Sequence, residues 1–108
     1  MRKFLITTTF LLSCLTISYA LTPQLIIYFA RDSNEAKNIQ NGDIYLVEHA
    51  LQNATNTSIH CIGFFVRNDG YISATRWEFR DSYNDTQIDT IIGIIHNLAY
   101  VEYVDRNP

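Results

Sequence analysis

Four short segments of the chain have the hydrophobic pattern of β-strands. The first is a continuous run of apolar, β-branched and aromatic residues, which predicts a strand buried on both faces. The other three are rich in aromatic and β-branched residues that alternate with smaller or polar ones. These strands are expected at residues 25–29, 59–67, 71–80 and 98–104. The sequence Asn68-Asp69-Gly70 predicts a hairpin between the second and third strands, because these residues tolerate the positive φ of tight turns.

A helix is predicted between the first two strands. Ile44, Val47 and Leu51 follow the helical repeat, with polar residues on the opposite side. Asn41-Gly42 predicts a break before this helix, so that Asn41 or Asp43 lies near its N-cap. Residues 35–40 are expected to form a separate turn.

A second helix is predicted between the third and fourth strands. Asp85 or Thr86 is its expected N-cap, and the apolar positions that follow are helically spaced. These positions are Ile88, Ile91, Ile92 and Ile95. The run Ile-Ile-Gly-Ile-Ile also leaves a strand open at this point, because isoleucine favours strands and glycine weakens helices.

The predicted order of elements is β-α-β-β-α-β within fewer than 90 residues, which is typical of the ferredoxin-like arrangement. The expected fold class is therefore α+β, with a four-stranded antiparallel sheet and two helices on one face. The other face of the sheet has no predicted cover. Because the strands carry apolar residues at both parities, that uncovered face is expected to contact another protein.

Tyr71, Trp77 and Phe79 are the candidate partner-binding residues of the uncovered face. They share one parity of the third strand, and large aromatic side chains are frequent at interface hot spots. A shift of one residue in register would exchange the two faces. The alternative that Trp77 lies in the core under the helices therefore stays open.

Residues 1–20 have the pattern of a secretory signal peptide, which leaves residues 21–108 as a single domain. Arg2 and Lys3 precede an apolar stretch, and Ser18-Tyr19-Ala20 offers small residues for cleavage. The expected location is thus secreted or periplasmic. Leu11-Leu12-Ser13-Cys14 also resembles a bacterial lipobox, so a lipid anchor on Cys14 is the alternative. The apolar stretch is too short and too rich in threonine to predict a membrane span.

Charge and composition argue against nucleic acid as a partner. Residues 21–108 hold six Lys and Arg against eleven Asp and Glu, a formal charge of −5. Such an acidic chain is a poor match for a phosphate backbone. The apolar content of 47% is enough for a packed core and excludes a disordered chain.

No residue pattern predicts an enzyme, a metal site or a cofactor site. His60 and Cys61 are adjacent, so on a strand their side chains point to opposite faces and do not form a nucleophile and base pair. Cys61 is expected to be buried. The His and Cys residues lack metal-ligand spacing, and no phosphate-binding or dinucleotide-binding motif is present.

Two segments carry a family resemblance. The run Leu25-Ile26-Ile27-Tyr28-Phe29 resembles the first strand of the subtilisin propeptide-like inhibitors. The segment from Ile92 to Glu102, Ile-Gly-Ile-Ile-His-Asn-Leu-Ala-Tyr-Val-Glu, is similar to the second helix and last strand of that family. The specific likeness covers about a dozen positions at the two ends of the predicted domain.

The resemblance implies a fold and a partner. Members have the β-α-β-β-α-β fold and act as intramolecular chaperones or stand-alone inhibitors of subtilisin-like serine proteases. Their open sheet face packs on the protease, and their C-terminal tail lies in the substrate cleft. Carried over to this chain, that tail is Asp105, Arg106, Asn107 and Pro108. No protease domain follows, so inhibition or chaperoning in trans is expected. The alternative is an interaction module, monomeric or homodimeric, that has no protease target.

Overall fold

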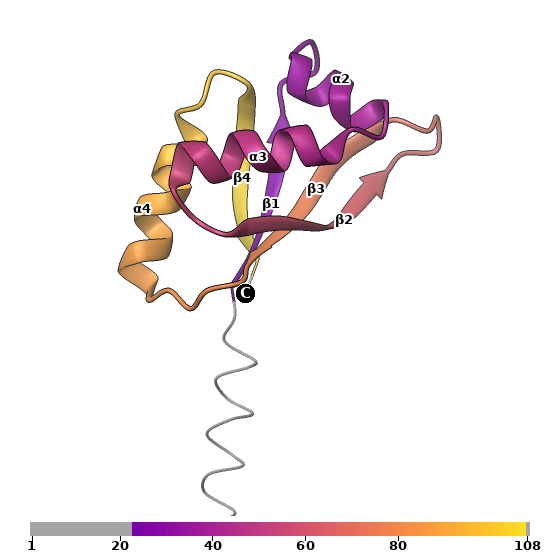
Figure 1. Ribbon diagram of the computed structural model, residues 1–108. Helices are drawn as coiled ribbons and strands as arrows, with labels where there is room; N and C mark the ends of the chain where they lie inside the picture. The colour runs from indigo at the N-terminus through magenta and orange to yellow at the C-terminus, as the bar shows by residue number, and fades with distance from the viewer. Residues whose placement is uncertain (1–22, 108) are drawn as a thin grey trace, which may run out of the picture.

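The computed structural model of the protein describes residues 23–107, and for Asn107 it describes the backbone only (Figure 1). The predicted signal peptide, the alternative lipid site Cys14 and the tail residue Pro108 lie outside the described residues. The elements in chain order are β1 (Gln24–Phe29), α2 (Asn34–Gln40), α3 (Ile44–Thr55), β2 (Ile59–Val66), β3 (Ile72–Phe79), α4 (Asp85–His96) and β4 (Val101–Asn107). None of these helices has the length and apolar character of a membrane-spanning segment.

The predicted α+β class and the four-stranded antiparallel sheet are confirmed. The strands lie in the order β2-β3-β1-β4, an order that the sequence analysis did not specify. Each neighbouring pair is antiparallel. The arrangement is consistent with a ferredoxin-like fold. Strands β2 and β4 are the two edges of the sheet.

The number of helices differs from the prediction, because the expected turn before the first helix is itself a helix. Ser33 caps α2 through its side chain, which accepts a hydrogen bond of 3.0 Å from the backbone nitrogen of Ala36. Gly42 then adopts a φ of +87°, a conformation that glycine tolerates without strain. This residue separates α2 from α3, so the described residues contain three helices rather than two.

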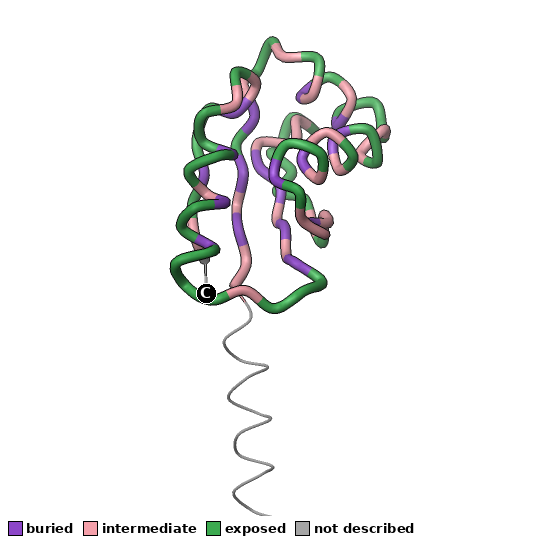
Figure 2. Tube along the Cα trace, turned by 60° about the vertical axis from the view of Figure 1, so that its left-hand side comes forward, coloured by how far each residue is buried: buried purple, intermediate pink, exposed green. Residues whose placement is uncertain are grey.

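The core lies between the sheet and the three helices, which all pack against one set of strand residues. In Figure 1 α3 crosses in front of the strands, and in Figure 2 buried positions alternate with exposed ones along strands and helices alike. The core includes Leu25, Ile27, Phe29, Ile59, Trp77, Phe79, Val101 and Val104 from the strands. The helices contribute Ala36, Ile39, Val47, Leu51, Ile88, Ile91 and Ile95.

A helix cap, a strand start and a strand register depart from the sequence prediction. Asn84, rather than Asp85 or Thr86, caps α4: its side chain accepts from the nitrogen of Gln87, whose own side chain accepts from the nitrogen of Asn84, at 2.8 and 2.9 Å. The last strand begins at residue 101 instead of 98, because residues 97–100 form the turn that leaves α4. The register of β2 shifts at residue 62, so the expected alternation of apolar residues along that strand is interrupted.

Candidate protein-interaction surface

The sheet face opposite the helices, called here the open face, is charged and polar over one half. His60 and Glu78 are register partners across β2 and β3, with 3.4 Å between Nε2 and Oε1. Arg76 donates a 3.0 Å hydrogen bond from Nη1 to Oε1 of Gln24 on β1. Asp105 of β4 is the register partner of Ile26 on the same face. This half therefore carries separate polar and charged pairs rather than an apolar patch.

The other half of the open face carries an aromatic pair. Tyr28 of β1 and Tyr103 of β4 are register partners, with ring centroids 5.8 Å apart. Their exposed fractions are 36% and 51%. Ile27 and Phe29, on either side of Tyr28, are both buried under the helices, so the tyrosine points away from the core. A partner protein that covered this pair would bury two large, stiff side chains at low cost in entropy.

A shallow groove of about 350 Å³ borders this tyrosine pair, at the end of the sheet where β1 finishes and β3 begins. Tyr71 lies in it, half-buried, with the guanidinium carbon of Arg31 4.7 Å from its ring centroid and that of Arg67 5.8 Å away. The groove is lined by Tyr28, Phe29, Arg31, Tyr71, Ser73, Glu102 and Tyr103. Its walls thus combine aromatic rings with one cation and one anion.

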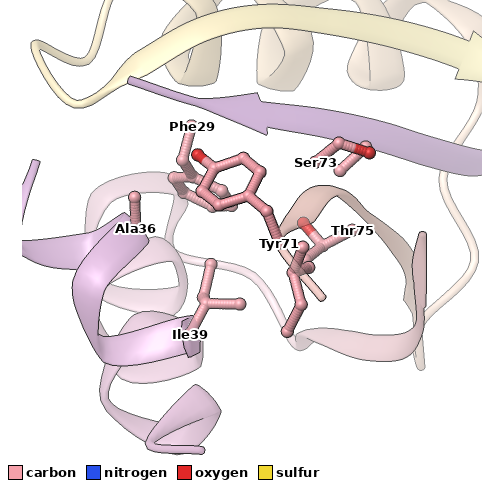
Figure 3. Close-up of a pocket in the computed structure, with 8 residues that line it drawn as sticks. Phe29, Ala36, Ile39, Tyr71, Ser73 and Thr75 are labelled. Carbon is pink, nitrogen blue, oxygen red and sulfur yellow. The ribbon is translucent and has the colours of Figure 1, made fainter. Parts of the chain in front are cut away.

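Tyr71 also separates this groove from a very small cavity (Figure 3). In the close-up its ring lies beside Phe29, and Ala36 and Ile39 of α2 lie across from it. The cavity measures about 10 Å³, which leaves room for no more than one water molecule. The cavity therefore does not hold a ligand, but it shows that Tyr71 packs on α2 as well as on the strands.

Trp77 and Phe79, two of the three aromatic candidates for the open face, lie on the helix side, which confirms the alternative left open for Trp77. Trp77 is fully buried and Phe79 is 4% exposed, both in the core under the helices. The indole Nε1 of Trp77 donates a 2.6 Å hydrogen bond to the hydroxyl oxygen of Thr75, so even its polar atom is satisfied internally. Neither side chain is available to a partner, and only Tyr71 of the predicted three remains at the surface.

The predicted tail is part of the sheet up to the last residue described. Asp105, Arg106 and Asn107 pair with Ile26, Leu25 and Gln24 of β1. The guanidinium of Arg106 turns to the helix side and contacts two carboxylates in the first turns of α4. Its Nη2 lies 2.6 Å from Asp85 Oδ1, and its Nη1 lies 3.3 Å from Asp89 Oδ1. Residues 105–107, predicted to follow the last strand, instead belong to β4, and their entry into a protease cleft stays a prediction.

The Cys61 thiol considered from the sequence contacts a backbone carbonyl group rather than a side-chain base. Cys61 is half-buried, and its thiol contacts the carbonyl oxygen of Gly63 at 3.5 Å. Burial raises the pKa of this thiol, which disfavours the thiolate that a nucleophile needs. Its neighbour His60 contacts Glu78 on the open face. Among residues 23–107 no three His, Cys, Asp or Glu side chains are arranged to hold a metal ion.

The groove residues Tyr28, Tyr103 and Arg31 were missed by the sequence analysis. A signal for Tyr28 existed, since it stands alone with a hydroxyl group between two purely apolar neighbours in β1. Arg31 and Tyr103 gave no comparable signal, because their place in the groove depends on how three separate strands meet. Comparison of the chain with protein-family models, with curated proteins and with solved structures found no match.

Proposed function

We propose that the protein is a protein-binding module that contacts its partner through the aromatic half of the open face. The observation that carries this proposal is the exposed Tyr28 and Tyr103 pair on the uncovered side of the sheet. Tyrosine is enriched at interface hot spots, because it offers large contact area with few rotatable bonds. Tyr71 and Arg31 in the adjoining groove extend the contact and add a hydrogen-bonding and cationic component.

A subtilisin-like serine protease is the proposed partner, inhibited or assisted in folding in trans. Support comes from the resemblance of the first strand and the last helix and strand to the propeptide-like inhibitors, together with an architecture compatible with a ferredoxin-like domain. The signal-like residues 1–20 fit a partner outside the cytoplasm. The proposed contact uses Tyr28, Tyr71 and Tyr103 in place of Trp77 and Phe79.

Cleft occupation by the tail would require a rearrangement. Arg106 and Asn107 would have to leave their register positions on β1, and Arg106 would have to release Asp85 and Asp89. Binding to a protease surface and blocking of its substrate cleft are therefore separable in this protein. Docking of the open face alone supports a chaperone-like contact, and release of the end of β4 adds inhibition.

Titration of several subtilisin-type proteases with the purified protein tests the proposal. Binding is measured by calorimetry, and inhibition by hydrolysis of a peptide substrate in parallel. Tyr103→Ala should weaken binding by about tenfold or more, the effect of a hot-spot tyrosine. Leu46→Ala is the control, because Leu46 is a similarly exposed large side chain on α3, on the helix side of the sheet. Equal losses for the two variants would contradict a contact through the open face.

A second candidate is an interaction module whose partner is not a protease. The pairing of residues 105–107 with β1 favours this candidate, because the described part of the tail is bound within the sheet and is not exposed for entry into a protease cleft. If no tested protease binds at micromolar protein concentration, this candidate gains over the first. The effect of Tyr103→Ala on binding then applies to whichever partner is found.

A further inference from the structure

Five of the large apolar side chains exposed in residues 23–107 gather along one edge of the sheet, away from the Tyr28 and Tyr103 pair. Four belong to the edge strand β2, which pairs on one side with β3 and on its outer side with no strand among the described residues. They are Ile62, Phe64, Phe65 and Val66, with exposed fractions of 39%, 46%, 39% and 61%. The fifth is Tyr45 of α3, at 58%.

The helical repeat places Tyr45 beside this strand. Residues 45, 48 and 52 lie on the same flank of α3, three and four positions apart. Gln52 donates a 2.9 Å hydrogen bond to the carbonyl oxygen of Ile59, so this flank faces β2. Because β2 runs back along α3 after residue 59, Tyr45 at the start of the helix lies toward the later part of the strand. We call these five residues the β2 flank.

The exposed residues of β2 point to both sides of the sheet. Phe65 is the register partner of Ala74 on the open face, and Phe64 is the register partner of the buried Thr75 on the helix side. A protein docked on either face alone would cover only one of the two phenylalanines. A strand added at the edge covers both and also satisfies the free backbone groups of β2.

The two edge strands differ in the residues that discourage pairing with another strand. The other edge, β4, carries Glu102, Asp105 and Arg106, charges of the kind that discourage edge-to-edge pairing. Residues 59–66 contain no charged residue of this kind and no proline. The chain as a whole is acidic, so an edge without carboxylates is also where two copies repel each other least.

From this geometry we infer that a second copy of the chain pairs with β2, antiparallel and about a two-fold axis, so that the two sheets join into one of eight strands. A single extended peptide is one layer thick and would leave Tyr45 of the helix layer uncovered. A second copy brings both its own strand and its own α3, so that each β2 flank covers the other, as an isologous interface requires. This inference does not depend on the proposed function, whose tyrosine pair lies on β1 and β4 rather than on β2.

The area available sets the expected strength of this dimer. At their exposed fractions the five side chains present about 400 Å² per copy, taking full aromatic side chains as about 200 Å². Two copies would bury about 800 Å² of side chain, and the two strand backbones bring the total close to the roughly 1,200 Å² at which specific interfaces begin. The dimer is therefore expected to be reversible and to depend on protein concentration.

Analytical ultracentrifugation over a range of protein concentrations tests the inference. The protein is expressed from its full sequence and is purified in whatever processed form the host produces. The wild-type protein should pass from monomer to dimer. Phe64→Lys should raise the Kd by about tenfold or more, because each copy would then have to bury a charged side chain in a shared apolar surface. Val66→Lys, at the most exposed position of the strand, should act in the same direction. Leu46→Lys is the matched control, since Leu46 is a 45% exposed residue of α3 that lies off the β2 flank.

Amide hydrogen exchange at low and high protein concentration locates the contact. Exchange in residues 61–66 should slow as the dimer forms, while exchange around Tyr28 and Tyr103 stays unchanged. Circular dichroism confirms that each variant is folded. A wild-type protein that stays monomeric at about 1 mM, a dimer protected elsewhere than β2, or an equal loss in Leu46→Lys would each overturn the inference. Tyr103→Ala separates this result from the proposed function, because it should leave self-association intact.

Discussion

Replacing Thr75 by valine should destabilise the fold through the only tryptophan of the chain. Trp77 is fully buried, and its Nε1 donates to the Thr75 hydroxyl oxygen at 2.6 Å. That hydroxyl in turn donates to the carbonyl oxygen of Ile27 at 3.2 Å, which links β3 to β1. Valine keeps the shape of threonine but removes the acceptor, so a buried N–H group is left without a partner.

The size of the effect follows from that unpaired donor. Leaving a buried polar group unsatisfied costs about 1–3 kcal/mol, and Thr75 at 1% exposure gives water no access to replace the lost bond. For a domain of this size, 1 kcal/mol corresponds to a shift of about 4–8 °C in Tm. Thr75→Val should therefore melt roughly 5–20 °C below the wild-type protein.

Urea unfolding followed by circular dichroism measures this free energy in every variant, including those without the single tryptophan and its fluorescence. The control is the same substitution in a Trp77→Phe background, where no indole N–H group is present to lose its hydrogen-bond acceptor. The cost of Thr75→Val should fall there by about 1 kcal/mol or more, the coupling expected of directly bonded residues. An equal cost of Thr75→Val in both backgrounds would refute the reasoning, because the loss would then have nothing to do with the indole.

Three further predictions concern the cap of α4, the end of β4 and the cysteine. Asn84→Ala removes the reciprocal capping bonds and should lower the free energy of unfolding by about 1 kcal/mol; no change in urea unfolding would show the cap to be dispensable. The double variant Asp85→Asn with Asp89→Asn frees Arg106 from exposed ion pairs, so it should speed amide exchange at the end of β4 at a cost of about 1 kcal/mol or less; unchanged exchange would contradict this. Burial raises the pKa of the Cys61 thiol, so the folded state favours the neutral form and stability should be lost as the pH rises above the ordinary thiol value of 9.0. Cys61→Ala should remove that part of the alkaline decline, and an identical decline in the variant would exclude the thiol as its source.

The strands and the hairpin were predictable because their signals are local. The apolar run of β1 and the turn at Asn68-Asp69-Gly70 depend on neighbouring residues only, and Gly70 indeed adopts a φ of +86°. The end of the chain was harder, because the start of β4 depends on how the turn after α4 closes. Leu98 accepts a hydrogen bond from the nitrogen of Val101 in that turn and does not enter the strand.

The face of Trp77 was predictable in principle from its neighbours. The residues that alternate with it in β3 are Arg76 and Glu78, which are costly to bury unpaired and therefore belong on the exposed side. Their parity puts Trp77 under the helices, which is the alternative that the strand pattern left open. The groove around Tyr71 could not be foreseen in this way, because it forms where three strands and α2 meet in space.

The first residue of β1 stands opposite the last described residue of β4, since Gln24 and Asn107 are register partners. Whatever is joined to either end therefore emerges at the same pole of the domain. The groove and the tyrosine pair lie at the other pole, about 17 Å away along the six residues of β1. A tether at either terminus, whether to a bilayer or to a fused carrier, would therefore attach at the end of the domain away from the groove. The groove and the tyrosine pair would then face away from the point of attachment.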